Sequence, residues 1–252
     1  MQPPIDALLQ PAVGAWAVVV RDSAGVDRYT LNPAQVLPSA SLIKVALAWQ
    51  FLELDAAERS ALYPIGPADI CDPEGSVAAL AGAALPLAEL ARRMVTESEN
   101  NATNIILARL GGPAVANRWL AERGYQATCW RRQMLDLAAR AAGRDNTTSA
   151  AEQARLLHTL RTSATASAAE LLAWLHAAVG TGKIEAGLPP GTPLAHKVGD
   201  LPDVEHDAGI ITLPSGDWYV LVIMVAQQPD PVAARAICAE VSRRCWKWLS
   251  VE

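Results

Sequence analysis

The stretch Ser41-Leu42-Ile43-Lys44 opens an apolar run that predicts a helix reaching about Leu54. Residues three apart share one helix face, so the Lys44 amine would lie beside the Ser41 hydroxyl. A partly desolvated lysine can accept the hydroxyl proton, and the amides at a helix N-terminus favour the negative charge that develops. The spacing alone is not specific, because most Ser-x-x-Lys sequences combine a helix-capping serine with a solvated lysine. The remainder of the chain decides between the two interpretations.

Segments of strand character lie on both sides of this helix in the sequence, and a long helical block separates them. The predicted strands are Gly14–Val20, Val26–Leu31, Leu194–Val198, Asp207–Leu213 and Trp218–Ala226. The helical block runs from Asp55 to Val179, and a last helix is predicted over Pro231–Leu249. Within the block, the predicted helices are Leu85–Thr96, Thr103–Arg109, Pro113–Arg123, Met134–Ala142, Ser149–Leu160 and Ala166–Ala178.

This order of elements predicts an α/β (α+β) fold. We expect a five-stranded antiparallel sheet flanked by terminal helices, with an all-helical lobe inserted between its two halves. The chain is predicted to form a single unit over residues 1–252. Residues 1–55 and 180–252 would build the sheet-containing lobe, and residues 56–179 the helical lobe.

Composition excludes several classes of protein. The 252 residues are 51% hydrophobic, enough for a large core, and the net charge of −5 argues against a nucleic-acid partner. No apolar run reaches the roughly 18 residues of a membrane span, and the N-terminus lacks the pattern of a signal peptide. We therefore expect a cytoplasmic monomer as written, or a periplasmic or secreted protein if a leader was removed. Four cysteines without zinc-site spacing predict neither a metal nor a cofactor.

Two further motifs make the Ser41-x-x-Lys44 spacing specific. Ser98-Glu99-Asn100 lies in the helical block, and Lys197-Val198-Gly199 lies on the first of the late strands. Ser-x-x-Lys, Ser-Asp-Asn and Lys-Thr-Gly together are the signature of class A β-lactamases and penicillin-binding proteins. Nearly the whole chain resembles that family, because the three motifs occur in its order and in its structural context. His206-Asp207-Ala208-Gly209-Ile210 is also similar to the strand that follows in the family.

The resemblance implies a role for each matching position. Ser41 would attack a carbonyl carbon, with Lys44 as its activating base, and the backbone N–H groups of Ser41 and Asp200 would form the oxyanion hole. Ser98 would pass a proton to the leaving nitrogen, and Lys197 would polarise that network and attract an anionic substrate. The implied substrate-binding residues are Glu99, Asn100, Val198, Gly199 and Asp200.

The chain departs from the family in the loop that should complete hydrolysis. Class A enzymes carry a glutamate there, which holds the water that hydrolyses the acyl-enzyme. The corresponding residues 124–149 contain no glutamate, and their only acids are Asp136 and Asp145. Asp145 matches a structural, loop-closing aspartate, which leaves Asp136 as a possible but shorter substitute base. We therefore expect acylation of Ser41 with poor deacylation, since a positioned base contributes roughly 10²–10⁴-fold.

Other departures concern recognition of an anionic substrate. Val198 replaces the hydroxyl residue in the middle of Lys-Thr-Gly, and Glu185 stands in a segment where many relatives carry an arginine. Both changes should weaken binding of a carboxylate, with Lys197 or a protonated His206 as compensating cations. Glu99 keeps the charge of the usual aspartate but lengthens the side chain.

Three hypotheses follow. The first is a β-lactamase-like serine hydrolase that forms an acyl-enzyme on Ser41 with β-lactams or related amides and esters. The second is a penicillin-binding DD-carboxypeptidase or transpeptidase-like enzyme, or an esterase, acting on a peptidoglycan-like amide or an ester. The third is a non-catalytic penicillin-sensing module, which the retention of every acylation residue disfavours.

Overall fold

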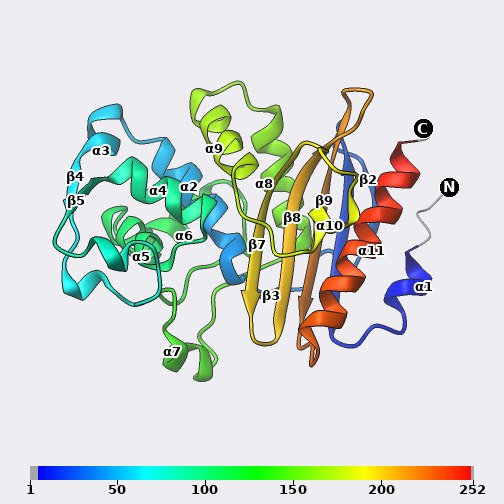
Figure 1. Ribbon diagram of the computed structural model, residues 1–252, viewed down its shortest axis with the longest axis horizontal. Helices are drawn as coiled ribbons and strands as arrows, with labels where there is room; N and C mark the ends of the chain where they lie inside the picture. The colour runs from blue at the N-terminus through cyan, green and yellow to red at the C-terminus, as the bar shows by residue number, and fades with distance from the viewer. Residues whose placement is uncertain (1–4, 251–252) are drawn as a thin grey trace.

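A five-stranded antiparallel sheet is the centre of the computed structural model, which describes residues 5–250 (Figure 1). Residues 1–4 and 251–252 of the predicted single unit lie outside this range. The strand order is β2-β1-β9-β8-β7, and every neighbouring pair is antiparallel. The strands are β1 (Ala15–Asp22), β2 (Asp27–Leu31), β7 (Leu194–Leu201), β8 (Val204–Thr212) and β9 (Trp218–Ala226). The predicted sheet is confirmed.

The sheet joins the two ends of the chain because β1 pairs with β9 along its whole length. Both strands are nearly continuous apolar runs, as expected where both faces of a sheet are covered. Alternate side chains point to opposite faces. Val19 and Val222 therefore belong to one core, whereas Val18 and Leu221 belong to the other.

Helices cover both faces (Figure 1). On one face lie α1 (Asp6–Leu9) and the closing helix α11 (Pro231–Leu249), whose bounds are those predicted. On the other face, α8 (Ala150–Thr162) and α9 (Ala166–His176) pack against the sheet. These two helices come from the predicted helical lobe, so that lobe and the sheet share one core.

The rest of the helical lobe surrounds α2 (Lys44–Leu52), which is buried along most of its length. Its helices are α3 (Ala56–Ser60), α4 (Leu87–Thr96), α5 (Asn100–Arg109), α6 (Pro113–Glu122) and α7 (Leu137–Ala141). Two short 3-10 turns, η2 (Pro67–Asp69) and η3 (Ala78–Leu80), lie in the connection before α4. Within residues 5–250, no helix is both long and apolar enough to cross a bilayer.

The lobe also contains short strands that the sequence analysis did not predict. β4 (Leu62–Pro64) pairs with β5 (Ala84–Pro86), so α4 begins two residues later than predicted. β3 (Leu37–Pro38) pairs with β6 (Thr147–Thr148) and thereby ties the segment before Ser41 to the end of the loop that precedes α8.

Candidate active site

Ser41 lies in η1 (Ala40–Ile43), a 3-10 turn that leads directly into α2. The sequence predicted the first turn of an α-helix here. In a 3-10 helix residues three apart are eclipsed, so Ser41 and Lys44 still lie on one side. Ala40 adopts a left-handed φ of 44°, a strained conformation of the kind that concentrates at functional sites.

Hydrogen bonds anchor the chain just before this turn. The Ser39 amide donates to the carbonyl of Asn146 at 2.8 Å, and His206 Nε2 donates to the carbonyl of Pro38 at 2.8 Å. His206 Nδ1 accepts from the Val225 amide at 2.9 Å, so the imidazole is neutral. Its complete burial lowers the pKa of His206 to about 4. The expectation that a protonated His206 helps to bind an anion is therefore wrong.

Lys44 is completely buried, and its amine makes contacts with the second motif. Lys44 Nζ lies 2.6 Å from the carbonyl oxygen of Ser98, 3.4 Å from Ser98 Oγ and 2.9 Å from Asn100 Oδ1. Burial, aided by the nearby charge of Lys197, holds the pKa of Lys44 well below its ordinary value. A neutral amine in this position can take a proton from a neighbouring hydroxyl.

The second motif lies in the short connection between α4 and α5. Ser98 has a left-handed φ of 58° and lines the same cavity as Ser41. Asn100 also lines this cavity, and its amide donates to Asp72 Oδ2 at 3.0 Å while its oxygen accepts from Lys44. The structure therefore brings together Ser41, Lys44, Ser98 and Asn100, as the motifs predicted.

The Glu99 side chain does not line the cavity and instead caps a helix. Its buried carboxylate caps α5 by accepting from the Ala102 backbone amide at 2.5 Å, and it also accepts from the side-chain Nδ2 of Asn101 at 2.8 Å. Asn101 Oδ1 in turn accepts from the backbone amides of Cys71 and Asp72. Glu99 thus holds the loop around the site, and its side chain does not line the cavity.

The third motif lies on β7 beside the nucleophile. Lys197 is 1% exposed, its amine donates to the carbonyl of Val198 at 3.0 Å, and burial lowers its pKa to about 8. Val198 lines the cavity. A Cβ atom at Gly199 would lie 3.2 Å from Ala40 Cβ and 3.3 Å from the Ser41 amide nitrogen. Glycine therefore lets β7 approach the nucleophile turn closely.

Asp200, also on β7, lines the cavity and pairs with Lys183, which directly precedes α10 (Ile184–Gly187). Glu185 accepts instead from the backbone amides of Gly182 and Lys183 and does not line the cavity. The expectation that Glu185 faces a substrate carboxylate is therefore wrong. The sequence analysis missed Lys183, although it was the only nearby cation in that segment.

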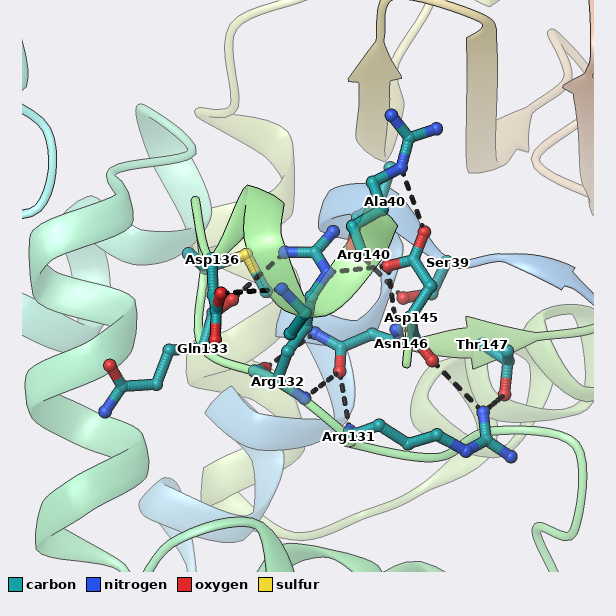
Figure 2. A network of polar contacts seen from close by, with 12 residues as sticks. Ser39, Ala40, Arg131, Arg132, Gln133, Asp136, Arg140, Asp145, Asn146 and Thr147 are labelled. Carbon is teal, nitrogen blue, oxygen red and sulfur yellow. Dashed lines mark hydrogen bonds and ion pairs between the residues drawn. The ribbon is translucent and has the colours of Figure 1, made fainter. Parts of the chain in front are cut away.

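The loop that should carry the hydrolytic base is closed by a polar network (Figure 2). Asp145 accepts from Arg132 Nε at 2.7 Å and from Arg140 Nε at 3.1 Å. Asn146 Oδ1 accepts from the backbone amides of Arg131 and Arg132 at 2.7 and 3.0 Å. The two ends of the loop are thereby held together, in keeping with the loop-closing position predicted for Asp145.

Met134 is the loop residue held most directly against the cavity. It is 6% exposed, its amide donates to Asn104 Oδ1 at 2.8 Å, and its carbonyl accepts from Asn104 Nδ2 at 3.3 Å. Asp136 accepts from the Ala139 amide at 2.9 Å as the cap of α7 and does not line the cavity. Leu135 has a left-handed φ of 61°, so the predicted helix from Met134 begins only at Leu137.

These elements enclose a cavity of about 290 Å³. Its walls include the predicted residues Ser41, Ser98, Asn100, Val198 and Asp200. Three residues with left-handed backbone, Ala40, Ser98 and Leu135, line it as well. Strained backbone conformations are therefore concentrated around the nucleophile.

One group of potential metal ligands exists within residues 5–250, formed by Glu185, His196 and Asp207. His196 Nδ1 lies 2.9 Å from Asp207 Oδ1, and Asp207 Oδ2 accepts from the Ile184 amide at 3.0 Å. The Glu185 carboxylate accepts a hydrogen bond from the backbone amide of Gly182 in the preceding turn. These ligand atoms are engaged with each other and with amides, which gives the group a structural role.

An antiparallel sheet with flanking helices that presents Ser41 and Ser98 in one cavity, with the buried Lys44 amine against Ser98, defines a β-lactam-acting serine hydrolase of the class A type. The chain belongs to the β-lactamase enzyme family, which it matches over residues 2–249.

Individual relatives agree with this assignment. A β-lactamase of Streptomyces albus G is 30% identical, with 93% of this chain and 80% of that protein covered. PBP-A superimposes with a TM-score of 0.88 at 27% identity, covering 98% of this chain and 95% of that one. An ancestral class A β-lactamase (GNCA) gives a TM-score of 0.87 at 28% identity, covering 96% and 97%.

Proposed function

We propose that Ser41 is acylated by β-lactams or related amides and esters and that the acyl-enzyme is hydrolysed slowly. The observation that carries acylation is the buried Lys44 amine, which contacts Ser98 and Asn100 one helical turn from the nucleophile. Its lowered pKa favours the neutral amine, the form that can act as a base.

In this mechanism Ser41 Oγ attacks the carbonyl carbon while Lys44 takes the hydroxyl proton. The oxyanion would be bound by the backbone N–H groups of Ser41 and Asp200, because both residues line the cavity and β7 packs against the nucleophile turn. Ser98 would protonate the leaving nitrogen, and Asn100 would hold the acyl side chain. Lys197, whose charge acts on the Lys44 amine, would keep the network of Lys44 and Ser98 polarised.

Slow hydrolysis follows from the groups that line the cavity. Among the described residues, the carboxylates that line the cavity are Glu97 and Asp200. Glu97 accepts from Ser76 Oγ at 2.5 Å, and Asp200 is paired with Lys183, so neither is free to activate water. The loop contributes the thioether of Met134 instead of a carboxylate. The acyl-enzyme therefore lacks a positioned general base.

A penicillin-binding DD-carboxypeptidase or transpeptidase-like activity is the second candidate. The likeness to PBP-A over nearly the whole chain favours it. A variant of PBP-A with a leucine-to-glutamate substitution forms an acyl-enzyme complex with penicillin G. For such an enzyme, a β-lactam would be a slow inhibitor and not a good substrate.

Burst kinetics with a chromogenic cephalosporin test the proposal. We expect one equivalent of rapid colour release per protein, followed by a slow phase, with a matching mass adduct that Ser41→Ala abolishes. Steady turnover without a burst or adduct would contradict slow hydrolysis. Hydrolysis of p-nitrophenyl esters without any β-lactam adduct would instead assign the site to an esterase.

A further inference from the structure

Lys183 lies behind the end of the cavity where the leaving group would lie, because its amine contacts the lining residues Thr181 and Asp200. The Val179 amide donates to the carbonyl of Thr96 at 2.9 Å, which places residues 179–181 beside Ser98. Val179 and Thr181 line the cavity together with Ser98. A carboxylate attached to the leaving group of an acyl donor would therefore approach the segment that carries Lys183.

The Lys183 amine is held by two hydrogen bonds and a further ion pair within the protein. The residue is completely buried, and Nζ donates to Thr181 Oγ1 at 2.7 Å and to Asp200 Oδ1. Glu205 Oε2 lies 3.1 Å from the same nitrogen. An ammonium group has three N–H donors, and three oxygens of the protein surround this one. A substrate carboxylate would have to displace one of them.

The local charges are balanced without a ligand. Burial disfavours the charged form of Lys183, but Asp200, Asp207 and Glu205 outweigh it and raise the pKa of the lysine above its ordinary value. Arg235 Nη2 donates to the second oxygen of Glu205 at 2.8 Å. The buried carboxylate of Glu205 and the exposed carboxylate of Asp200 thus face the two cations Lys183 and Arg235, which carry no charge in excess of these acids.

The cavity wall supplies no replacement cation. Within residues 5–250, its charged lining residues are Glu97, Asp200 and Arg132. Arg132 is bound to Asp145 and to the carbonyl of Gln133. The wall therefore carries two carboxylates against one guanidinium that is already paired.

The third motif adds no exposed cation or hydroxyl at this end, since Lys197 is 1% exposed and does not line the cavity. Lys197 donates to the backbone carbonyl of Val198. Val198 itself presents an apolar side chain to the cavity where a hydroxyl could have donated to a carboxylate. An anionic group would meet Glu97 and Asp200 without a compensating hydrogen bond, and an unpaired charge in such a site is disfavoured.

Resting on the proposed acylation of Ser41, we propose that this site is specific for acyl donors without a negative charge on the leaving-group side. Lys183, held by Asp200 and Glu205, is the specificity-determining group, because its internal ion pairs fill the place of a substrate carboxylate. Neutral esters and amides are the substrate class that fits this charge distribution.

The test compares two acyl donors that differ in one charge, benzylpenicillin and its methyl ester. The second-order rate of Ser41 acylation is measured for each by intact mass on the full chain. We expect the ester to react at least threefold faster than the free acid. A ratio of ester to acid rates below threefold, or a faster reaction of the free acid, would overturn the inference while leaving acylation of Ser41 intact. Labelling by neither compound would overturn the proposed function itself and the inference with it.

A variant separates the charge effect from the bulk of the methyl group. Asp200→Asn frees Lys183, so the ratio of ester to acid rates is expected to fall at least tenfold. Asp217→Asn, on the β8–β9 turn, removes the same charge at a distance and should leave the ratio unchanged. An unchanged ratio in folded Asp200→Asn would refute the role of Lys183. Should that variant not fold, Glu205→Gln removes the charge of the other carboxylate beside Lys183 and is expected to lower the ratio in the same direction, and an unchanged ratio there would equally refute it.

Discussion

Met134→Glu should convert a slowly hydrolysed acyl-enzyme into a faster one. Met134 lines the cavity with Ser41, and the side-chain amide of Asn104 holds its backbone at both the N–H and the carbonyl. Glutamate matches methionine in length, so its carboxylate would occupy the place of the thioether. Arg132 also lines the cavity with its backbone held, by Asn146, but its side chain is bound to Asp145, which leaves Met134 as the position to change.

The magnitude follows from what a positioned base contributes. General-base activation of water accelerates a reaction roughly 10²–10⁴-fold. This corresponds to about 3–5 kcal/mol of the deacylation barrier. The cost is a carboxylate at a position that is 6% exposed in the native protein, which we expect to lower the free energy of unfolding by about 1–3 kcal/mol.

The assay is the decay of a trapped acyl-enzyme. The protein is labelled with benzylpenicillin, excess compound is removed, and the loss of the adduct is followed by intact mass. Met134→Gln is the matched control, because it has the same length and polarity without a basic oxygen. The reasoning is refuted if the glutamate variant loses its adduct no faster than the glutamine variant.

Three further predictions concern the same site. Gly199→Ala should slow acylation about 10- to 100-fold in stopped-flow measurements, since the added Cβ would displace the Ser41 turn. An unchanged rate would show that β7 moves away from the turn and would contradict this prediction. The pH profile of acylation should fall on acidification as Lys44 becomes protonated, and above about pH 8 as Lys197 loses its proton; a flat profile would contradict both roles. Asp145→Asn should lower the free energy of unfolding in urea by about 2–4 kcal/mol, because the buried arginine of the loop loses its carboxylate.

The motifs predicted which distant segments would lie together, because they fix local chemistry. Ser41, Ser98 and Asn100 line one cavity and the Lys44 amine contacts Ser98 and Asn100, although more than 50 residues separate the first motif from the second. The apolar runs of β1 and β9 predicted a sheet between the two ends of the chain. Such signals can be recognised in the sequence because both burial and catalysis restrict the residue types at those positions.

Side-chain direction was not predictable in the same way. The motif placed Glu99 among the substrate contacts, but the free amides at the start of α5 compete for its carboxylate. Glu185 was expected opposite a substrate, yet it serves the turn before α10, and Lys183 lies behind Asp200 instead. A left-handed φ at Leu135 ended the predicted helix early, a backbone choice that helical periodicity does not report.

The lifetime of the adduct on Ser41 tests the central claim most directly. The full chain is incubated with benzylpenicillin, freed of excess compound, and followed by intact mass against Ser41→Ala. We predict a single adduct on the native chain that persists well beyond the dead time, and none on the variant. Complete consumption of benzylpenicillin by a protein whose mass remains unmodified throughout would contradict the account.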